Sequence, residues 1–159
     1  MNTTNKSTLS VAAIKNGTVI DHIAAGQGLS IVNLLGLSHN HQQVTIGLNL
    51  PSKNMGYKDL VKVEGQELTK NDVDRVAILA PTATINIIKG YDVTKKFKVT
   101  VPEKIKGLFT CPNPVCITNH EAMTTLFTTI QNKKDLQLRC EFCEKIFSRA
   151  ELVNSNHTV

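Results

Sequence analysis

The four cysteines of this 159-residue chain all lie in its last third, as two closely spaced pairs. Four residues separate Cys111 from Cys116, and two separate Cys140 from Cys143. Two such pairs place four thiolates on adjacent loops, which suits the tetrahedral coordination of Zn²⁺. Because four protein ligands leave no coordination position for water or substrate, the spacing predicts one structural zinc ion per chain.

Alternative interpretations of the cysteines fit the sequence less well. Disulfides are rare in reducing compartments, and four reduced core cysteines have no need to occur in tight pairs. His120 lies four residues after Cys116, but the cysteines already complete a tetrahedral shell. The N-terminus lacks the apolar stretch of a secretory signal, and no apolar run approaches the ~18 residues of a membrane helix. We therefore expect a cytoplasmic protein without membrane contact.

The position of the cysteines also divides the chain. The first 110 residues contain none, and the charged stretch Lys95–Lys104, which includes Pro102, has the character of a short connection. The sequence predicts two domains, residues 1–102 and residues 103–159. The second domain, of roughly 50 residues, is near the size at which a hydrophobic core alone rarely suffices, so bound metal would supply much of its folding free energy.

The first domain shows an alternation of strand and helix patterns. We expect a hairpin of two strands, Leu9–Ile14 and Thr18–Ile23, around Asn16-Gly17. The elements expected after it are a helix over Ala25–Leu35, strands over Gln43–Leu50 and Asp59–Val63, a helix from the cap at Thr69–Asp72 to Pro81, and strands over Ala83–Ile88 and Tyr91–Phe97. This order predicts an α+β fold. We expect a ferredoxin-like βαββαβ domain with an additional final strand, followed by a small β-rich zinc-binding domain.

The sequence favours a binding module over an enzyme. We find no motif of a catalytic nucleophile, a phosphate-binding loop or a metalloprotease, so we expect no enzymatic activity. The net charge of +5 is compatible with nucleic-acid binding, which makes a zinc-ribbon nucleic-acid-binding protein the main alternative. Five Phe, two Tyr and no Trp leave few side chains on which bases could stack, however. An enzyme that acts on nucleotides is a more distant alternative.

Six segments of the sequence resemble the regulatory chain of aspartate carbamoyltransferase, in the same order and at the same spacings. These segments are Gly17–Ile23, Thr45–Ser52, Met55–Leu60, Ala80–Thr84, Cys111–Asn113 and Cys140–Lys145. The likeness extends from about Val11 to Phe147, which is nearly the whole chain.

The resemblance implies a non-catalytic subunit that controls pyrimidine nucleotide biosynthesis. In this family the N-terminal domain binds ATP, CTP and UTP as allosteric effectors. The zinc domain docks on the catalytic chain, for which the resemblance implies the interface residues Asn113, Glu144 and Lys145. The family also implies a regulatory dimer formed by the first domain, and a holoenzyme in which three such dimers bridge two catalytic trimers. Nucleic acid is then not expected as a partner.

The resemblance also assigns nucleotide-binding residues to this sequence. They are Val11, Ala13, Ile14, Val19, Asp21, His22, Lys62, Asn86, Ile88, Tyr91, Val93 and Lys96. In this assignment Lys62 and Lys96 supply positive charge, Asp21 accepts hydrogen bonds from ribose hydroxyls, and His22 approaches a phosphate.

Overall fold

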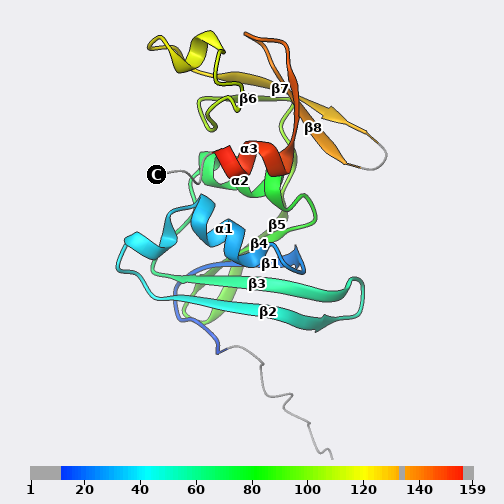
Figure 1. Ribbon diagram of the computed structural model, residues 1–159. Coiled ribbons are helices and arrows are strands. Elements are labelled where there is room, and N and C mark those ends of the chain that lie inside the picture. The colour runs from blue at the N-terminus through cyan, green and yellow to red at the C-terminus, as the bar shows by residue number, and fades with distance from the viewer. Residues whose placement is uncertain (1–11, 133–134, 156–159) are drawn as a thin grey trace, which may run out of the picture.

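A five-stranded antiparallel sheet forms the first half of the structure, a computed structural model that describes residues 12–132 and 135–155. Its strands are β1 (Gly17–Ala24), β2 (Val44–Ser52), β3 (Gly56–Glu64), β4 (Thr84–Lys89) and β5 (Asp92–Lys98). They lie in the order β2-β3-β1-β4-β5, and helices α1 (Gly28–Leu34) and α2 (Lys70–Leu79) cover one face (Figure 1). This is the predicted βαββαβ arrangement, with β5 as the additional strand at one edge.

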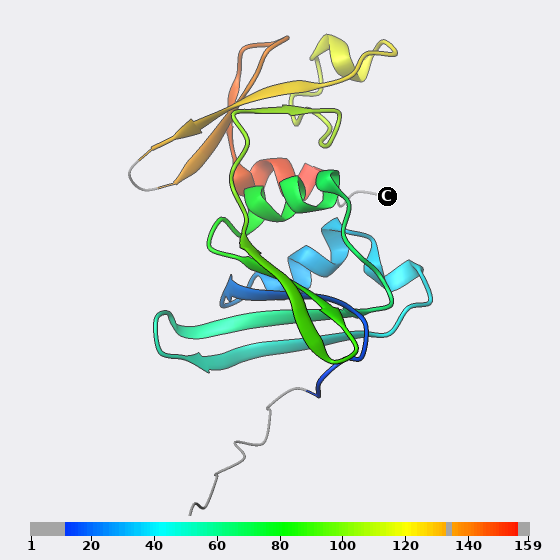
Figure 2. The same cartoon turned by 180° about the vertical axis from the view of Figure 1, so that it is seen from behind.

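A four-stranded antiparallel sheet with the order β6-β7-β8-β9 follows. Its strands are β6 (Lys104–Lys106), β7 (Leu126–Gln131), β8 (Leu136–Cys140) and β9 (Ile146–Ser148). The described residues also form two short 3₁₀ helices, η1 (Leu37–His39) and η2 (Ile117–Asn119). Helix α3 (Arg149–Ser155) lies beside α2, between the two sheets (Figures 1 and 2). The prediction of an α+β fold with a small β-rich C-terminal part is confirmed. None of the helices in residues 12–132 and 135–155 is long and apolar enough to cross a membrane.

One buried hydrophobic cluster joins the two sheets. It contains Ile20 and Ile85 of the first sheet, Ile78 of α2, Leu152 of α3 and Phe127 of the second sheet, all completely buried. Because the cluster is continuous, α2 and α3 pack the two halves against each other through apolar contact.

Helix α2 forms where the sequence predicts it because both of its ends carry signals. The Oγ1 atom of Thr69 accepts a hydrogen bond from the backbone N–H of Asp72 at 3.2 Å, and the Asp72 carboxylate accepts one from the Thr69 N–H at 3.0 Å. This reciprocal capping box satisfies two backbone donors of the first turn. Pro81 stops the helix because it cannot continue the hydrogen-bond ladder.

The predicted hairpin turn at Asn16 is wrong. Residues 12–14 form no strand, and β1 pairs with β3 and β4 instead. Asn16 instead forms hydrogen bonds with two distant loops. Its carbonyl accepts from the Gly65 N–H at 2.9 Å, and its side-chain Oδ1 accepts from the Gly90 N–H at 3.0 Å. Residues 9–11 of the predicted first strand lie outside the described residues.

Two predicted boundaries are displaced. The first helix begins at Gly28 rather than Ala25. Half of the charged stretch expected as a connection is strand, because β5 continues through Lys98 and β6 begins at Lys104. The connection between the sheets is therefore residues 99–103.

A buried carboxylate fixes the loops at one end of the first sheet. Asp59 of β3 is completely buried. Its Oδ2 atom accepts hydrogen bonds from the backbone N–H groups of Gly26 and Gly28, and its Oδ1 atom accepts one from Asn49, each at 2.9 Å. One side chain thus satisfies three backbone donors and ties the start of α1 to β2 and β3, which also explains why α1 starts late.

Replacing Asp59 with Asn tests this role. An amide nitrogen cannot accept a hydrogen bond, so Asp59→Asn leaves a buried backbone donor unsatisfied and lowers the free energy of unfolding by about 1–3 kcal/mol in a urea titration. Asp92→Asn, the same change on an exposed strand position, is the control and leaves the midpoint almost unchanged. Equal midpoints for the two variants contradict the role given to Asp59.

Candidate metal centre and candidate effector site

The four cysteines meet at one point. Their Sγ atoms all lie within 4.8 Å of one another, and the distances Cys111–Cys143 and Cys116–Cys140 are both 3.8 Å. A tetrahedron with Zn–S bonds of about 2.3 Å has S···S edges of about 3.8 Å, whereas a disulfide needs about 2.05 Å. All four are free thiols, and the cluster is compatible with a zinc ion.

Backbone hydrogen bonds shape the two loops that carry the thiols. In the second loop the Cys140 N–H donates to the carbonyl of Lys145 at 3.0 Å, and the Glu144 N–H donates to the carbonyl of Cys140 at 2.9 Å. In the first loop the Asn119 side-chain amide donates to the carbonyls of Cys111 at 3.0 Å and Asn113 at 2.7 Å. Each of these hydrogen bonds lies within one loop, so it shapes that loop but does not join the two loops to each other.

The direction of the pKa shift differs among the thiols. Burial raises the pKa of Cys111 and of Cys140. Burial acts in the same direction on Cys116, but hydrogen bonds from Thr118 outweigh it and lower the pKa of Cys116 to about 7. The Thr118 Oγ1 atom lies 3.2 Å from that sulfur. A thiolate is the form that binds metal, so this loop favours the metal-binding state.

The predicted interface residues lie around this cluster, in two different environments. Asn113 is buried in the first cysteine loop, where its Oδ1 atom accepts from the Val115 N–H at 3.3 Å. Glu144 and Lys145 are exposed in the second loop. His120 does not join the thiols, because its Nε2 atom lies 2.8 Å from the carbonyl oxygen of Pro114.

Four of the predicted nucleotide-site residues form one row across the first sheet. The strand register places Val19 of β1 between Lys62 of β3 and Asn86 of β4, and Asn86 beside Lys96 of β5. The next residue along β1, Ile20, is completely buried under the helices. Since side chains alternate between the faces of a sheet, the row lies on the face opposite the helices.

The rows of paired residues on either side of this one contain further residues of the predicted nucleotide site. Toward one end of the sheet Asp21 pairs with Thr84, which in turn pairs with Lys98. Toward the other end Ile88 pairs with Val93. Ile88 is buried and Val93 is 56% exposed. The helix-free face therefore changes from apolar to cationic along the strands.

The segment before β1 borders this face. The Lys62 ammonium donates to the carbonyl of Ala12 at 2.6 Å, and the backbone N–H of Tyr91 donates to the carbonyl of Lys15 at 2.9 Å. Burial lowers the pKa of Lys62, and the charge of Asp21 partly offsets this effect. The other predicted residues of this segment are Val11, which lies outside the described residues, Ala13, which is exposed, and Ile14, which is buried.

A β-bulge places Asp21 and His22 at the cationic end. The register with β3 shifts between Ile20 and Ile23, and His22 has a φ of +55°. The Asp21 carboxylate pairs with the Lys58 ammonium at 2.8 Å and accepts from the His22 backbone N–H at 2.7 Å. Burial acts to raise the pKa of Asp21, but these contacts outweigh it and hold that pKa below its ordinary value.

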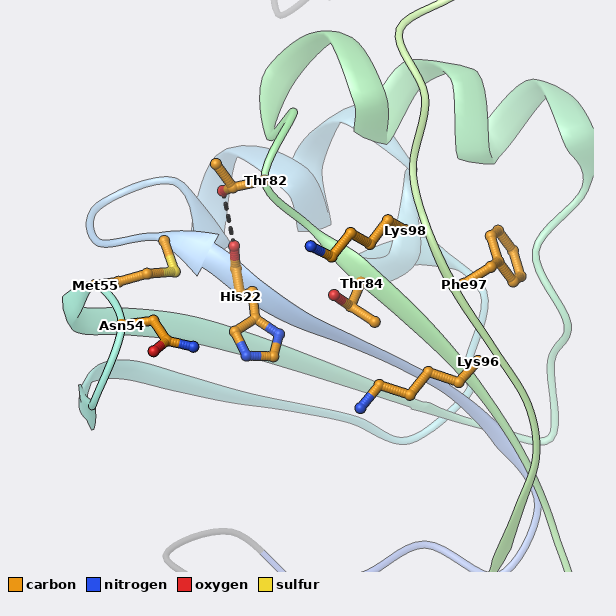
Figure 3. Close-up of a pocket in the computed structure, with 8 residues that line it drawn as sticks. All are labelled: His22, Asn54, Met55, Thr82, Thr84, Lys96, Phe97 and Lys98. Carbon is orange, nitrogen blue, oxygen red and sulfur yellow. Dashed lines mark hydrogen bonds between the residues drawn. The ribbon is translucent and has the colours of Figure 1, made fainter.

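A cavity of about 510 Å³ lies beside His22. Its lining residues are His22, Asn54, Met55, Thr82, Thr84, Lys96, Phe97 and Lys98 (Figure 3). The side chains of Lys96 and Lys98 extend toward His22, whereas the Phe97 ring points the other way (Figure 3). The Nδ1 atom of His22 is buried without a hydrogen-bond partner among the described residues. This arrangement can bind an anionic group.

Residue patterns could have identified part of this lining. Thr84 and Lys98 precede or follow Asn86 and Lys96 by two residues, so strand alternation alone places them on the same face. The β2–β3 turn, which contributes Asn54 and Met55, carries no pattern that indicates its proximity to β1. Neither does Thr82, whose hydroxyl donates to the carbonyl of His22 at 2.9 Å.

Comparison with known proteins finds two family matches that together span most of the chain. Residues 9–100 match the aspartate carbamoyltransferase regulatory chain, allosteric domain, and residues 103–153 match the metal binding domain of the same regulatory chain. Among curated proteins, the aspartate carbamoyltransferase regulatory chain of Pyrococcus horikoshii is 51% identical over 147 residues, which are 91% of this chain and 96% of the relative. The protein of the same name from Photobacterium profundum is 46% identical over 153 residues, which are 96% of this chain and 99% of the relative.

Thiol reactivity tests the metal centre directly, because the sequence has no cysteine outside the cluster. We expect one zinc ion per purified chain and thiols that react slowly with a thiol reagent. Chelation should release the ion and make all four thiols reactive, because metal coordination protects thiolates. Rapid reaction of four thiols before chelation, or the absence of thiols after it, contradicts a zinc tetrathiolate.

Proposed function

Because the chain belongs to the family of aspartate carbamoyltransferase regulatory chains, with an allosteric and a metal-binding domain, we propose that it binds ATP, CTP and UTP as effectors on the helix-free face of its first sheet. Its relatives are named as regulatory chains, so the chain is a non-catalytic subunit. The bound nucleotide then regulates catalytic sites that lie at a distance, in the partner chain.

The observation that carries the proposal is the shared face of the predicted nucleotide residues. Four strands contribute to the row that runs from Lys62 through Val19 and Asn86 to Lys96. At its apolar side the half-buried Val19 and the exposed Val93 offer contact surface to a base, and at its polar side Asp21 offers a carboxylate to ribose hydroxyls. Cationic side chains at the far end suit a triphosphate.

The second sheet has a different proposed role, which is assembly. A zinc ion held by the four cysteines fixes both cysteine loops, and the exposed Glu144 and Lys145 are then presented to the catalytic chain together with the loop of Asn113. We propose that a dimer of regulatory chains, formed through the first domain, bridges catalytic trimers in this way. The division between the domains is proposed at residues 102 and 103, inside the connection 99–103.

Two physical links support coupling between the effector face and the docking domain. Strand β5, which carries Lys96, leads directly into residues 99–103, and the Thr129 hydroxyl and N–H of β7 donate to the carbonyls of Pro102 and Glu103 at 2.8 and 2.9 Å. Helices α2 and α3 supply the second link through the shared apolar cluster. A coupling free energy of about 1–3 kcal/mol is typical of allosteric pairs of sites.

The Lys96→Ala variant tests the effector site. Loss of a charge-assisted contact should weaken CTP and ATP binding by roughly tenfold or more in calorimetry. Lys95→Ala is the matched control, because it removes the same charge from the neighbouring position of β5, on the opposite face. Equal affinities of the Lys96→Ala variant and the parent chain contradict the proposed site.

The Cys140→Ser variant tests the assembly role. A missing zinc ligand should prevent formation of a complex with catalytic trimers in size-exclusion chromatography, because the docking loops lose their shared metal. Nucleotide binding by the same variant is the control for an intact first domain. A stable complex formed by the variant argues against docking through the metal centre.

A further inference from the structure

Lys98 is a cavity residue that is not among the nucleotide-site residues assigned by the resemblance. It is the last residue of β5, lies in register with Thr84 of β4, and extends toward His22 in the cavity (Figure 3). Lys96, two residues earlier, lines the same cavity. Two ammonium groups from one strand therefore face one space.

The charges in this part of the sheet are not balanced. Lys58 pairs with the Asp21 carboxylate at 2.8 Å, and the Lys62 ammonium donates to the Ala12 carbonyl at 2.6 Å. Neither Lys96 nor Lys98 forms an ion pair with a carboxylate of the described chain, and none of the described residues that line the cavity is acidic. Two neighbouring cations without a counter-charge favour a polyanion over a single carboxylate.

The distance along the strands separates the two ends of the site. Ile88 marks the apolar end, and Thr84, four residues earlier in β4, marks the row of Lys98. At about 3.3 Å per residue the two rows lie about 13 Å apart. Lys96 lies one row nearer to Ile88 than Lys98 does, so of these two lysines Lys98 is the one nearer to the far end of a ligand whose base lies near Ile88.

We propose that Lys98 binds the outer phosphates of the effector and gives the site its preference for nucleoside triphosphates over monophosphates. The inference rests on the proposed effector function, and it adds to it the residue that recognises phosphate length. Thr84, next to Lys98 in the adjacent strand, supplies a neutral hydrogen-bonding group on the same floor of the cavity.

Calorimetric titration of the full chain with CTP, CMP and inorganic tripolyphosphate tests the proposal. We expect Lys98→Ala to weaken binding of CTP and of tripolyphosphate by roughly tenfold. The same variant should change CMP binding by less than about twofold, because CMP has no outer phosphate that could contact Lys98. Lys98→Arg keeps the charge and should retain most of the affinity. Lys95→Ala, which removes a charge outside the cavity, should match the parent chain.

Each other outcome has a definite meaning. Unchanged CTP and tripolyphosphate affinities in Lys98→Ala, or equal losses for CTP and CMP, overturn the role of Lys98. If the parent chain binds tripolyphosphate in a Lys98-dependent way but binds CTP no more tightly, the phosphate site stands and the nucleotide effector function fails. If it binds none of the three ligands, both proposals fail.

Discussion

The register of the central strand β1 determines most of what this chain presents to its surroundings. Paired on both sides, β1 places Ile20 under the helices and Val19 on the opposite face, in line with Lys62 and Asn86. A slip of one residue would exchange these faces and bury the polar row. The start of the strand enforces the pairing, because a Cβ atom at Gly17 would lie 2.0 Å from the Val63 carbonyl oxygen. The hydrophobic core and the proposed effector face therefore have a common origin.

The second sheet depends on a different balance of forces. Its strands are short, and two of them, β6 and β9, have only three residues each. The thiol cluster and the hydrogen bonds of the cysteine loops give this part of the chain a geometry that a small core would not. Its apolar contacts are shared with α2, so the two halves form one buried cluster. A change in the first sheet has a packed route to the metal-binding domain, by way of the helices and of residues 99–103.

The residue patterns correctly predicted those features that depend only on residues close together in the sequence. The capping box of Thr69 and Asp72, the stop at Pro81 and the cysteine spacing each identify one feature without help from the rest of the fold. The hairpin at Asn16 failed because a two-residue turn over Asn16 and Gly17 needs the Lys15 carbonyl to accept from the Thr18 N–H, and the distant Tyr91 N–H donates to that carbonyl instead. The nucleotide residues came from the resemblance, since isolated Ile, Val and Lys positions carry no signal of their own. Strand alternation could have added Thr84 and Lys98, whereas the proximity of the β2–β3 turn to His22 depends on tertiary structure.

Hydrogen exchange of the chain with and without CTP, followed by mass spectrometry, tests the central claim most directly. We expect slower exchange on nucleotide addition in residues 12–24 and in β4 and β5, because these segments form the proposed effector face, with a smaller change across residues 99–103. Unchanged exchange in those segments at saturating nucleotide, or protection confined to the cysteine loops, would contradict an effector site on the first sheet.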